Sequence, residues 1–365
     1  MTRTLVVRLD SAGDVLLAGP AVRAVAASST HVALLCGPQG AAAAELLPGV
    51  DRTVVWEAPW VGFDPPPLAA EDVRAVVARL ARQRFDHAVV LTSFHQSPLP
   101  TALLLRLAGV GAVAADCEDY PGSLLDLRHR RAPGRHEAEA ALDLALAAGF
   151  PLPPHDDGRL RVLPPPDLRH LTGPDPYVVV HPGAAVPARA AGPAVLAAAV
   201  RALTASGRRV VVTGGPAEQE LTAEVAGAHA LDLGGRTDLR ALSAVLAGAD
   251  AVVAGNTGPA HLAAAVGTPV VSLFAPVVPF ERWRPFGVPH LLLGRQDAPC
   301  AASRARVCPV EGHPCLDTLT GDQIAAAVDR LTSGAAPGPG GQFPPARPST
   351  GKPSTRKPST RKVSS

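Results

Sequence analysis

Short apolar runs rich in Val, Leu and Ala alternate along the chain with longer stretches in which apolar residues recur at helical spacing. This alternation is typical of parallel α/β layers, in which a helix follows each strand and packs on the sheet. In the first half, the pattern predicts strands at Leu5–Leu9, His31–Cys36, Thr53–Trp56, His87–Leu91 and Gly111–Ala115. It predicts helices there at about 15–28, 39–47, 70–83, 98–108 and 136–149.

The alternation repeats in the second half. Strands are predicted at Tyr177–His181, Arg209–Thr213, Ala230–Leu233, Ala251–Gly255, Pro269–Phe274 and His290–Leu293. Helices are predicted near 192–206, 216–227, 238–248, 258–266 and 321–332. Residues 151–176, between the halves, hold eight prolines, which neither a central strand nor a helix tolerates. We therefore expect domains at 1–150 and 177–333, a linker at 151–176, and a ligand cleft between the carboxyl ends of the strands.

The end of the chain differs in composition. Residues 334–365 are rich in Pro and Ser, contain no acidic residue, and include the sequence K-P-S-T-R-K-P-S-T-R-K. Such a segment is expected to be disordered, because it lacks the apolar residues needed to pack. It is either a solvated extension without a fixed partner or a tail that binds acidic surfaces weakly. Its basic residues are Arg347, Lys352, Arg356, Lys357, Arg361 and Lys362.

The rest of the composition indicates a globular protein of the cytoplasm. With 365 residues and 47% hydrophobic residues, the chain can bury a core without disulfides. No apolar stretch reaches the roughly 18 residues of a membrane span. The sequence MTRTLVVRLD reads as a strand with a charge inside it, unlike the apolar core of a signal peptide.

The charge balance limits the chemistry of residues 1–333. Without the six basic residues of the tail, 28 Lys and Arg stand against 32 Asp and Glu, which argues against a nucleic-acid-binding surface. All three lysines lie in the tail, so a Schiff-base or Walker-type lysine is excluded from the two domains. Anions must be bound there by Arg, His or backbone amides.

Five cysteines without a C-x-x-C pair favour reduced thiols over a disulfide framework. Cys300, Cys308, His313 and Cys315 have the identities of metal ligands, but their spacing C-x7-C-x4-H-x-C matches no common zinc pattern. We expect unligated thiols, and a structural metal is the alternative.

Candidate chemistry lies in the turns that follow strands. In V-V-R-L-D-S-A-G-D-V-L-L, residues 6–17, Asp14 is expected in the first turn of a helix that points into the cleft. The alternative is that Asp14 only interacts favourably with the helix dipole. The turn is not G-x-G-x-x-G, which argues against a nicotinamide-dependent oxidoreductase.

Two turns of the second half carry glycines next to charged residues. In H-P-G-A-A-V-P-A-R, residues 181–189, the amides near Gly183 can hold phosphate oxygens and Arg189 can add a bidentate contact; the alternative is an ordinary loop with a surface arginine. In T-G-G-P-A-E, residues 213–218, the backbone can approach a ligand at Gly214. Glu218 can accept hydrogen bonds from a ribose or sugar hydroxyl, or it is a first-turn acid without a ligand.

The most specific segment is A-G-N-T-G-P-A-H, residues 254–261. A strand ends at Asn256, and Thr257 and Gly258 open a helix whose amides face the cleft. Backbone amides and helix dipole together form an anion site there. His261 follows in the first turn, either as a phosphate contact or as a packing histidine.

Together these segments resemble the bacterial heptosyltransferases, glycosyltransferase family nine, over about residues 3–333. The resemblance rests on R-L-D-S-A-G-D-V-L-L-A-G-P-A-V-R, H-P-G-A with a following arginine, T-G-G-P-A-E, L-G-G-R-T-D-L and N-T-G-P-A-H-L-A-A-A-V-G-T-P, in the order of the family. It implies a GT-B fold of two Rossmann-like domains, with the acceptor on the first and the nucleotide-sugar on the second. It also implies inversion at the anomeric carbon without a metal, and ADP-heptose as donor.

The resemblance also implies roles for single residues. Asp14 corresponds to the proposed catalytic base, and Arg189 to a diphosphate contact. The other donor-binding candidates are Gly183, Thr213, Gly214, Glu218, Asn256, Thr257, Gly258 and His261. The acceptor-binding candidates are Ser11, Gly13, His95 and Gln96. Two departures affect the sugar contacts: Asn256 replaces the Asp of many members, and no Trp follows Arg189.

The sequence thus predicts an inverting, metal-independent glycosyltransferase that moves a sugar from an ADP-sugar to a hydroxyl of a glycan or small molecule. It predicts no cofactor besides this donor substrate, and no nucleic-acid partner. The alternative is a nucleotide-sugar-binding protein with a degenerate, non-catalytic site, which Asn256 and the missing Trp would favour.

Overall fold

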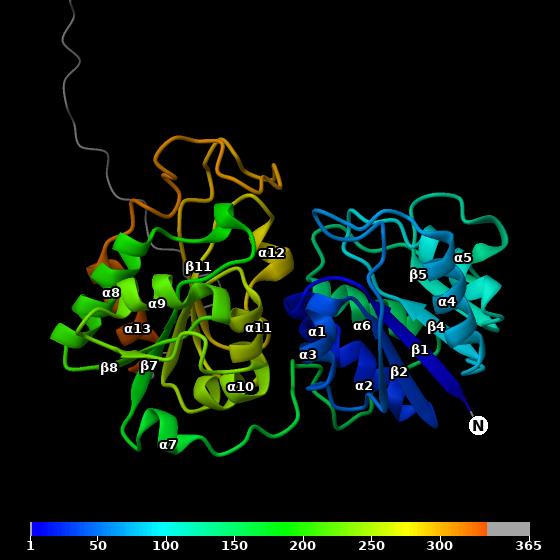
Figure 1. The fold of residues 1–365 in the computed structure, drawn as a ribbon, viewed down its shortest axis with the longest axis horizontal. Helices are drawn as coiled ribbons and strands as arrows, with labels where there is room; N and C mark the ends of the chain where they lie inside the picture. The colour runs from blue at the N-terminus through cyan, green and yellow to red at the C-terminus, as the bar shows by residue number, and fades with distance from the viewer. Residues whose placement is uncertain (1, 334–365) are drawn as a thin grey trace, which may run out of the picture.

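The computed structural model describes residues 2–333, which form two lobes side by side (Figure 1). Each lobe contains a parallel six-stranded sheet with helices packed against it. The α/β fold predicted from the alternation of apolar runs is therefore confirmed. The basic tail, residues 334–365, lies outside the described residues.

The first lobe has the strand order β3-β2-β1-β4-β5-β6. Its strands are β1 (Arg3–Arg8), β2 (His31–Cys36), β3 (Arg52–Val55), β4 (His87–Val90), β5 (Ala112–Asp116) and β6 (Leu127–His129). Its helices are α1 (Ala12–Leu17), α2 (Gly19–Ala27), α3 (Ala41–Ala44), α4 (Ala70–Ala81), α5 (Leu99–Leu107) and α6 (Glu137–Ala147).

The helix predicted at 15–28 is wrong in its start and its continuity. The first helix already begins at Ala12, and the stretch divides at Ala18 into α1 and α2. Pro20 explains the division, because it lacks the N–H that would bond to the carbonyl four residues earlier and its ring crowds that carbonyl. The edge strand β6 was not predicted, because only three residues form it and two of them are Arg and His.

The second lobe has the strand order β12-β11-β10-β7-β8-β9. Its strands are β7 (Tyr177–His181), β8 (Arg209–Val212), β9 (Leu231–Asp232), β10 (Ala251–Gly255), β11 (Val270–Leu273) and β12 (His290–Leu293). Its helices are α8 (Pro193–Ala205), α9 (Gln219–Ala226), α10 (Leu239–Ala247), α11 (Gly258–Ala265), α12 (Phe280–Trp283) and α13 (Gly321–Thr332). The proline-rich segment between the lobes contains the short helix α7 (Arg169–Thr172).

Both faces of the sheets are covered, as expected for strands without a polar face. In β1, Val6 packs into one apolar cluster while Leu5 and Val7 pack into another on the opposite face. Successive side chains of a strand point to opposite faces, so the two clusters are the helix layers on either side of the sheet.

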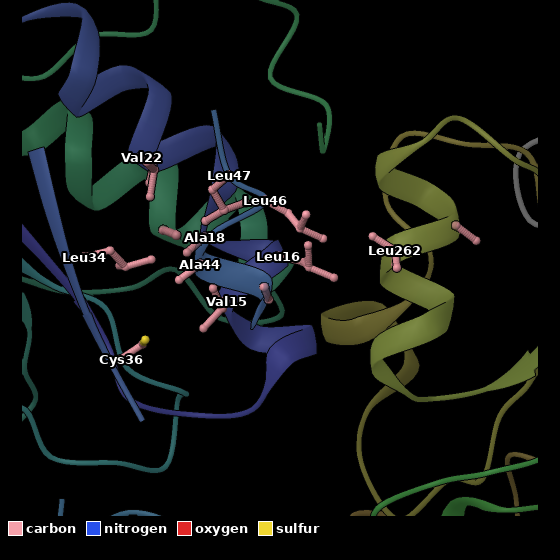
Figure 2. Close-up of a cluster of buried hydrophobic side chains, with 14 of the residues drawn as sticks. Val15, Leu16, Ala18, Val22, Leu34, Cys36, Ala44, Leu46, Leu47 and Leu262 are labelled. Carbon is pink, nitrogen blue, oxygen red and sulfur yellow. The ribbon is translucent and has the colours of Figure 1, made fainter. Parts of the chain in front are cut away.

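The lobes meet where the first turns of α1 and α11 face each other (Figure 1). A Cβ atom at Gly13 would lie 2.9 Å from Cδ2 of His261 and 3.4 Å from Cα of Gly258, so the close approach requires glycine on α1. Beside it, Leu16 and Leu262 point toward each other across the gap (Figure 2). Leu16 and Leu262 belong to one buried apolar cluster, so burial of apolar surface stabilises this contact between the lobes.

A second contact between the lobes lies at the start of α6. The ring of His136 stacks on Phe286 with 4.6 Å between centroids, and its Nε2 lies 2.9 Å from the carbonyl oxygen of Arg284. Since Nδ1 of His136 accepts from the amide of Ala138, Nε2 carries the proton and donates. Burial lowers the pKa of His136 to about 3, so the ring is neutral.

Candidate functional site

A cavity of about 490 Å³ lies between the lobes, at the carboxyl ends of the strands. Its first-lobe wall is mainly the turn from β1 into α1, and its second-lobe wall is formed mainly by the segments after β7, β8, β9 and β10. It therefore brings together motifs that are far apart in the sequence. The predicted residues that line it are Ser11, Gly13, Asp14, Gly183, Arg189, Gly214, Glu218, Asn256, Thr257, Gly258 and His261.

Asp14 is held by two donors of its own lobe. Nη2 of Arg8 donates to its Oδ1 at 2.9 Å, and the hydroxyl of Ser11 donates to its Oδ2 at 2.8 Å. Burial raises the pKa of Asp14, but the Arg8 cation and the Ser11 hydroxyl outweigh burial, so its pKa lies below the ordinary value. Asp14 is thus an oriented carboxylate at neutral pH.

Arg8 is the centre of a buried group of charges. It is only 3% exposed, its Nε lies 3.0 Å from Oδ2 of Asp10, and its Nη2 lies 3.7 Å from Oε2 of Glu137. Burial raises the pKa of Asp10 to about 6, against the lowering effect of Arg8. Arg8 was not among the predicted site residues, although a charge inside an apolar strand was a visible signal. Its partner Glu137 could not be inferred, because it comes from α6.

The second-lobe wall presents polar atoms that have no protein partner. Within residues 2–333, buried atoms without a hydrogen bond include Nε of Arg189, Nδ2 of Asn256, Oγ1 of Thr257 and Nδ1 of His261. Buried polar groups in folded proteins are almost always paired, so a cluster of unpaired ones marks a place where a ligand binds. Three of these groups are donors or hydroxyls, which suits a ligand rich in oxygen acceptors.

The start of α11 adds to this wall. Thr257 is its N-cap residue and makes no side-chain cap, so the first amides of the helix are not occupied by that hydroxyl. Pro259 has no N–H, and the amides of Ala260 and His261 donate to the carbonyl of Thr257, so the amide of Gly258 and the helix dipole are what favour an anion at this end. His261, one turn on, is neutral: burial lowers its pKa to about 4, while the nearby Asp14 carboxylate acts in the opposite direction.

Glu218 has a structural contact besides its place on the cavity wall. Its Oε2 accepts a hydrogen bond of 2.7 Å from the amide of Gly215, which closes the turn before α9. The turn packs so tightly on the loop after β7 that a Cβ at Gly183 would lie 1.9 Å from Oε1 of Glu218. A larger residue at position 183 would therefore displace the carboxylate of Glu218.

Three predicted residues lie outside the cavity wall. Thr213 is fully buried behind it, where its hydroxyl contacts Nδ1 of His181 at 3.0 Å. Gln96 anchors its loop, because it donates to Asp10 and accepts from the amide of Ser93. His95 is exposed on the same loop, and its pKa is lowered to about 4 by partial burial and by the charge of Arg304.

The cavity also contains residues that sequence analysis missed. His181, Gln39, Asp238 and Trp283 line it. Trp283 places an aromatic ring at the site, although no Trp follows Arg189 in the sequence. Little in the sequence indicates that Trp283 belongs to the site, because Trp283 lies on the four-residue helix α12, which the apolar pattern did not predict. His181 stands at the start of H-P-G-A, where the glycine is the stronger sign of a ligand site.

Among residues 2–333, no group of three or more His, Cys, Asp or Glu is arranged to hold a metal ion. All five cysteines are free thiols; Cys300 and Cys315 are buried, and Cys308 is partly exposed.

Among residues 2–333, no helix is both long enough and apolar enough to cross a membrane.

A model of glycosyltransferase family 9 (heptosyltransferase) matches residues 73–313, more than half of the chain. The chain belongs to this family. This family 9 protein is accordingly a glycosyltransferase, as predicted. A comparison with curated protein sequences gives no match.

Solved structures share the fold of this family 9 glycosyltransferase. E. coli ADP-heptose LPS heptosyltransferase II has 20% identity and a TM-score of 0.67, over 91% of this chain and 99% of that one. A family 9 glycosyltransferase from Veillonella parvula has 17% identity and a TM-score of 0.74, over 91% and 97%. E. coli heptosyltransferase WaaC, solved with ADP-2-deoxy-2-fluoro heptose, has 22% identity and a TM-score of 0.64, over 91% and 99%. The predicted fold of two facing Rossmann-like domains is confirmed.

Proposed function

We propose that the chain is an inverting glycosyltransferase that transfers heptose from ADP-heptose to a hydroxyl of a glycan or small-molecule acceptor. One observation carries the proposal: an oriented carboxylate of the first lobe and a set of unpaired donors of the second lobe line the same cavity. A base and an anion site on opposite walls are what this reaction needs. That WaaC was solved with an ADP-heptose analogue supports the choice of donor.

In the proposed step, Asp14 takes the proton of the acceptor hydroxyl while the hydroxyl oxygen attacks the anomeric carbon. The bond from that carbon to the diphosphate oxygen breaks on the opposite side, so the configuration inverts and ADP leaves. Arg189 and the amide of Gly258 at the start of α11 stabilise the negative charge that develops on the departing diphosphate. We propose that these groups take the place of a metal ion in this role.

Arg8 is a positioning residue in this scheme. Its hydrogen bond to Oδ1 and that of Ser11 to Oδ2 fix the plane of the Asp14 carboxylate. The same contacts keep Asp14 ionised, so the base is ready without prior loss of a proton. We propose that the acceptor enters on this first-lobe side, past Ser11 and Gly13, with His95 at the rim.

The donor contacts are proposed from the second-lobe wall. Arg189, Thr257 and Gly258 would bind the diphosphate, and Glu218 would accept hydrogen bonds from hydroxyls of the ribose or sugar. Asn256 offers an amide where many members of the family have a carboxylate, so it can donate to the ligand as well as accept. We propose the cytoplasm as the place of reaction, which the free state of all five cysteines supports.

The uncharged Asn256 also favours a second candidate, a nucleotide-sugar-binding protein without turnover. A thermal-shift screen of ADP-, UDP- and GDP-sugars and NAD tests binding, because a ligand stabilises the fold by RT ln(1 + [L]/Kd). ADP-sugars should give the largest shift. Release of ADP from ADP-heptose with glycan acceptors, in the presence of EDTA, then tests turnover. Binding without ADP release would favour the second candidate, and activity lost with EDTA would overturn the metal-free scheme.

A further inference from the structure

His181, the last residue of β7, is a buried histidine to which the proposed step assigns no role. Its side chain lines the cavity and is 7% exposed. On one edge of the ring, Nδ1 lies 3.0 Å from Oγ1 of Thr213 at the end of the neighbouring strand β8. Nε2 is on the other edge of the ring.

The environment of Thr213 decides which ring nitrogen carries the proton. Thr213 is fully buried, and among residues 2–333 its hydroxyl has His181 as its one partner. A hydroxyl has one proton to donate, and a buried donor without an acceptor is unfavourable. Thr213 therefore donates to Nδ1 of His181. Burial also lowers the pKa of His181 to about 4, so the ring is neutral and its single proton is on Nε2.

The neighbours of the ring indicate what this N–H group meets. His181 lines the cavity together with Gly183 and Gly214, which lie two residues past the ends of β7 and β8, and with Glu218. We propose that Nε2–H of His181 donates a hydrogen bond to an oxygen of the nucleoside diphosphate, either a phosphate oxygen or a ribose oxygen. This inference rests on the proposed function, since it takes the donor as an ADP-sugar.

A neutral donor at this position has a chemical consequence. It orients the diphosphate without adding a second full positive charge beside Arg189. The additional negative charge of product ADP is then attracted less strongly by His181 than it would be by a protonated imidazolium. The hydrogen bond from His181 then aligns the nucleoside diphosphate, and ADP can still be released.

Two substitutions of His181 test the roles of Nδ1 and Nε2 separately. In His181→Asn, the amide oxygen replaces Nδ1 and still accepts from Thr213, but no group replaces Nε2. In His181→Gln, the longer amide places its nitrogen near the position of Nε2, while Thr213 loses its acceptor. We expect H181N to retain the wild-type melting temperature and to bind ADP at least about tenfold more weakly. We expect H181Q to melt at a lower temperature and to bind ADP within about threefold of wild type.

Calorimetry with ADP and AMP, together with thermal unfolding, provides the readouts, and the exposed His170→Asn is the matched control. A loss for ADP alone assigns the contact to the terminal phosphate, and an equal loss for AMP assigns it to the rest of the nucleotide. A purely structural role of His181 predicts unchanged ADP affinity in H181N, and this result would overturn the inference. If wild type itself does not bind ADP, it is the proposed function that fails.

Discussion

Asp14→Asn is the substitution that most directly tests the proposed base. The Asn side chain has the shape of Asp, so Oδ1 can still accept from Arg8 while Nδ2 faces Ser11, whose hydroxyl oxygen can turn to accept. Arg8 keeps Asp10 and Glu137 as counter-charges, at 3.0 and 3.7 Å. The loss of one ion pair at an 18% exposed carboxylate should cost about 1–2 kcal/mol of stability, less than the removal of a sole partner would. The variant should fold.

The effect on turnover should be much larger. Assistance by a general base contributes about 10²–10⁴-fold, which corresponds to about 2.7–5.5 kcal/mol of the activation barrier. An amide cannot take up the acceptor proton, so kcat should fall by this factor. The affinity for ADP should be unchanged or slightly higher, because a negative charge is removed from the wall opposite Arg189.

The assay is ADP release from ADP-heptose in the presence of acceptor, with the melting temperature measured on the same preparation. Asp10→Asn is the matched comparison, since it also removes a carboxylate beside Arg8 but one that does not line the cavity. Its loss of turnover should be at least about tenfold smaller than that of D14N, whose loss is set by base catalysis. If D14N keeps turnover within about threefold of wild type, below the range for a lost base, Asp14 is a helix-end residue. His95 would then be the next candidate base.

Three further outcomes are expected. Arg189→Ala should weaken donor and ADP binding together by about 2–4 kcal/mol, measured by calorimetry, and unchanged ADP affinity would remove Arg189 from the site. Removal of residues 334–365 should leave the melting temperature and ADP binding unchanged, because that sequence lacks apolar residues to pack; a large drop would show that the tail docks. The third concerns pH: since the pKa of His136 is lowered from 6.5 to about 3, the unfolded state binds its proton first as the pH falls, and stability is lost from about pH 6.5 downward. His136→Gln keeps the donor to Arg284, so between pH 6 and 4 its stability should depend on pH by about 1.4 kcal/mol per unit less than that of wild type, measured by denaturant unfolding. Equal slopes would mean that His136 is protonated in the fold.

Much of the fold could be predicted because its strands are buried on both faces. A strand such as His31–Cys36 or Tyr177–His181 then stands out as a continuous apolar run, and the structure has both with the predicted bounds. Prediction failed where burial is weak. The edge strand Leu127–His129 has no fully buried residue, and α12 is held by packing of Trp283 on both lobes and not by its own periodicity.

The candidate site could be predicted as far as its residues follow strands directly, because parallel strands bring their carboxyl ends to one edge. Asp14, Arg189 and Thr257 reach the cavity for this reason. The partners of Arg8 and the place of Trp283 depend on how α6 and α12 pack, which local motifs do not encode. Thr213 shows the opposite error: it belongs to a recognised motif, but its side chain points behind the wall.

The charges around Asp14 also bear on how a carboxylate with a lowered pKa can act as a base. The connected ion pairs join three guanidinium groups, Arg8, Arg131 and Arg282, and the imidazole of His129 to four carboxylates, Asp10, Asp14, Glu137 and Asp116. With all four carboxylates ionised, they outnumber the guanidinium cations by one, and uptake of the acceptor proton by Asp14 removes this difference. At the same moment, negative charge grows on the diphosphate at the opposite wall, next to Arg189. The proton and the developing charge thus go to separate walls of the cavity. The lowered pKa of Asp14 in the absence of ligand therefore does not by itself limit its basicity toward a bound acceptor.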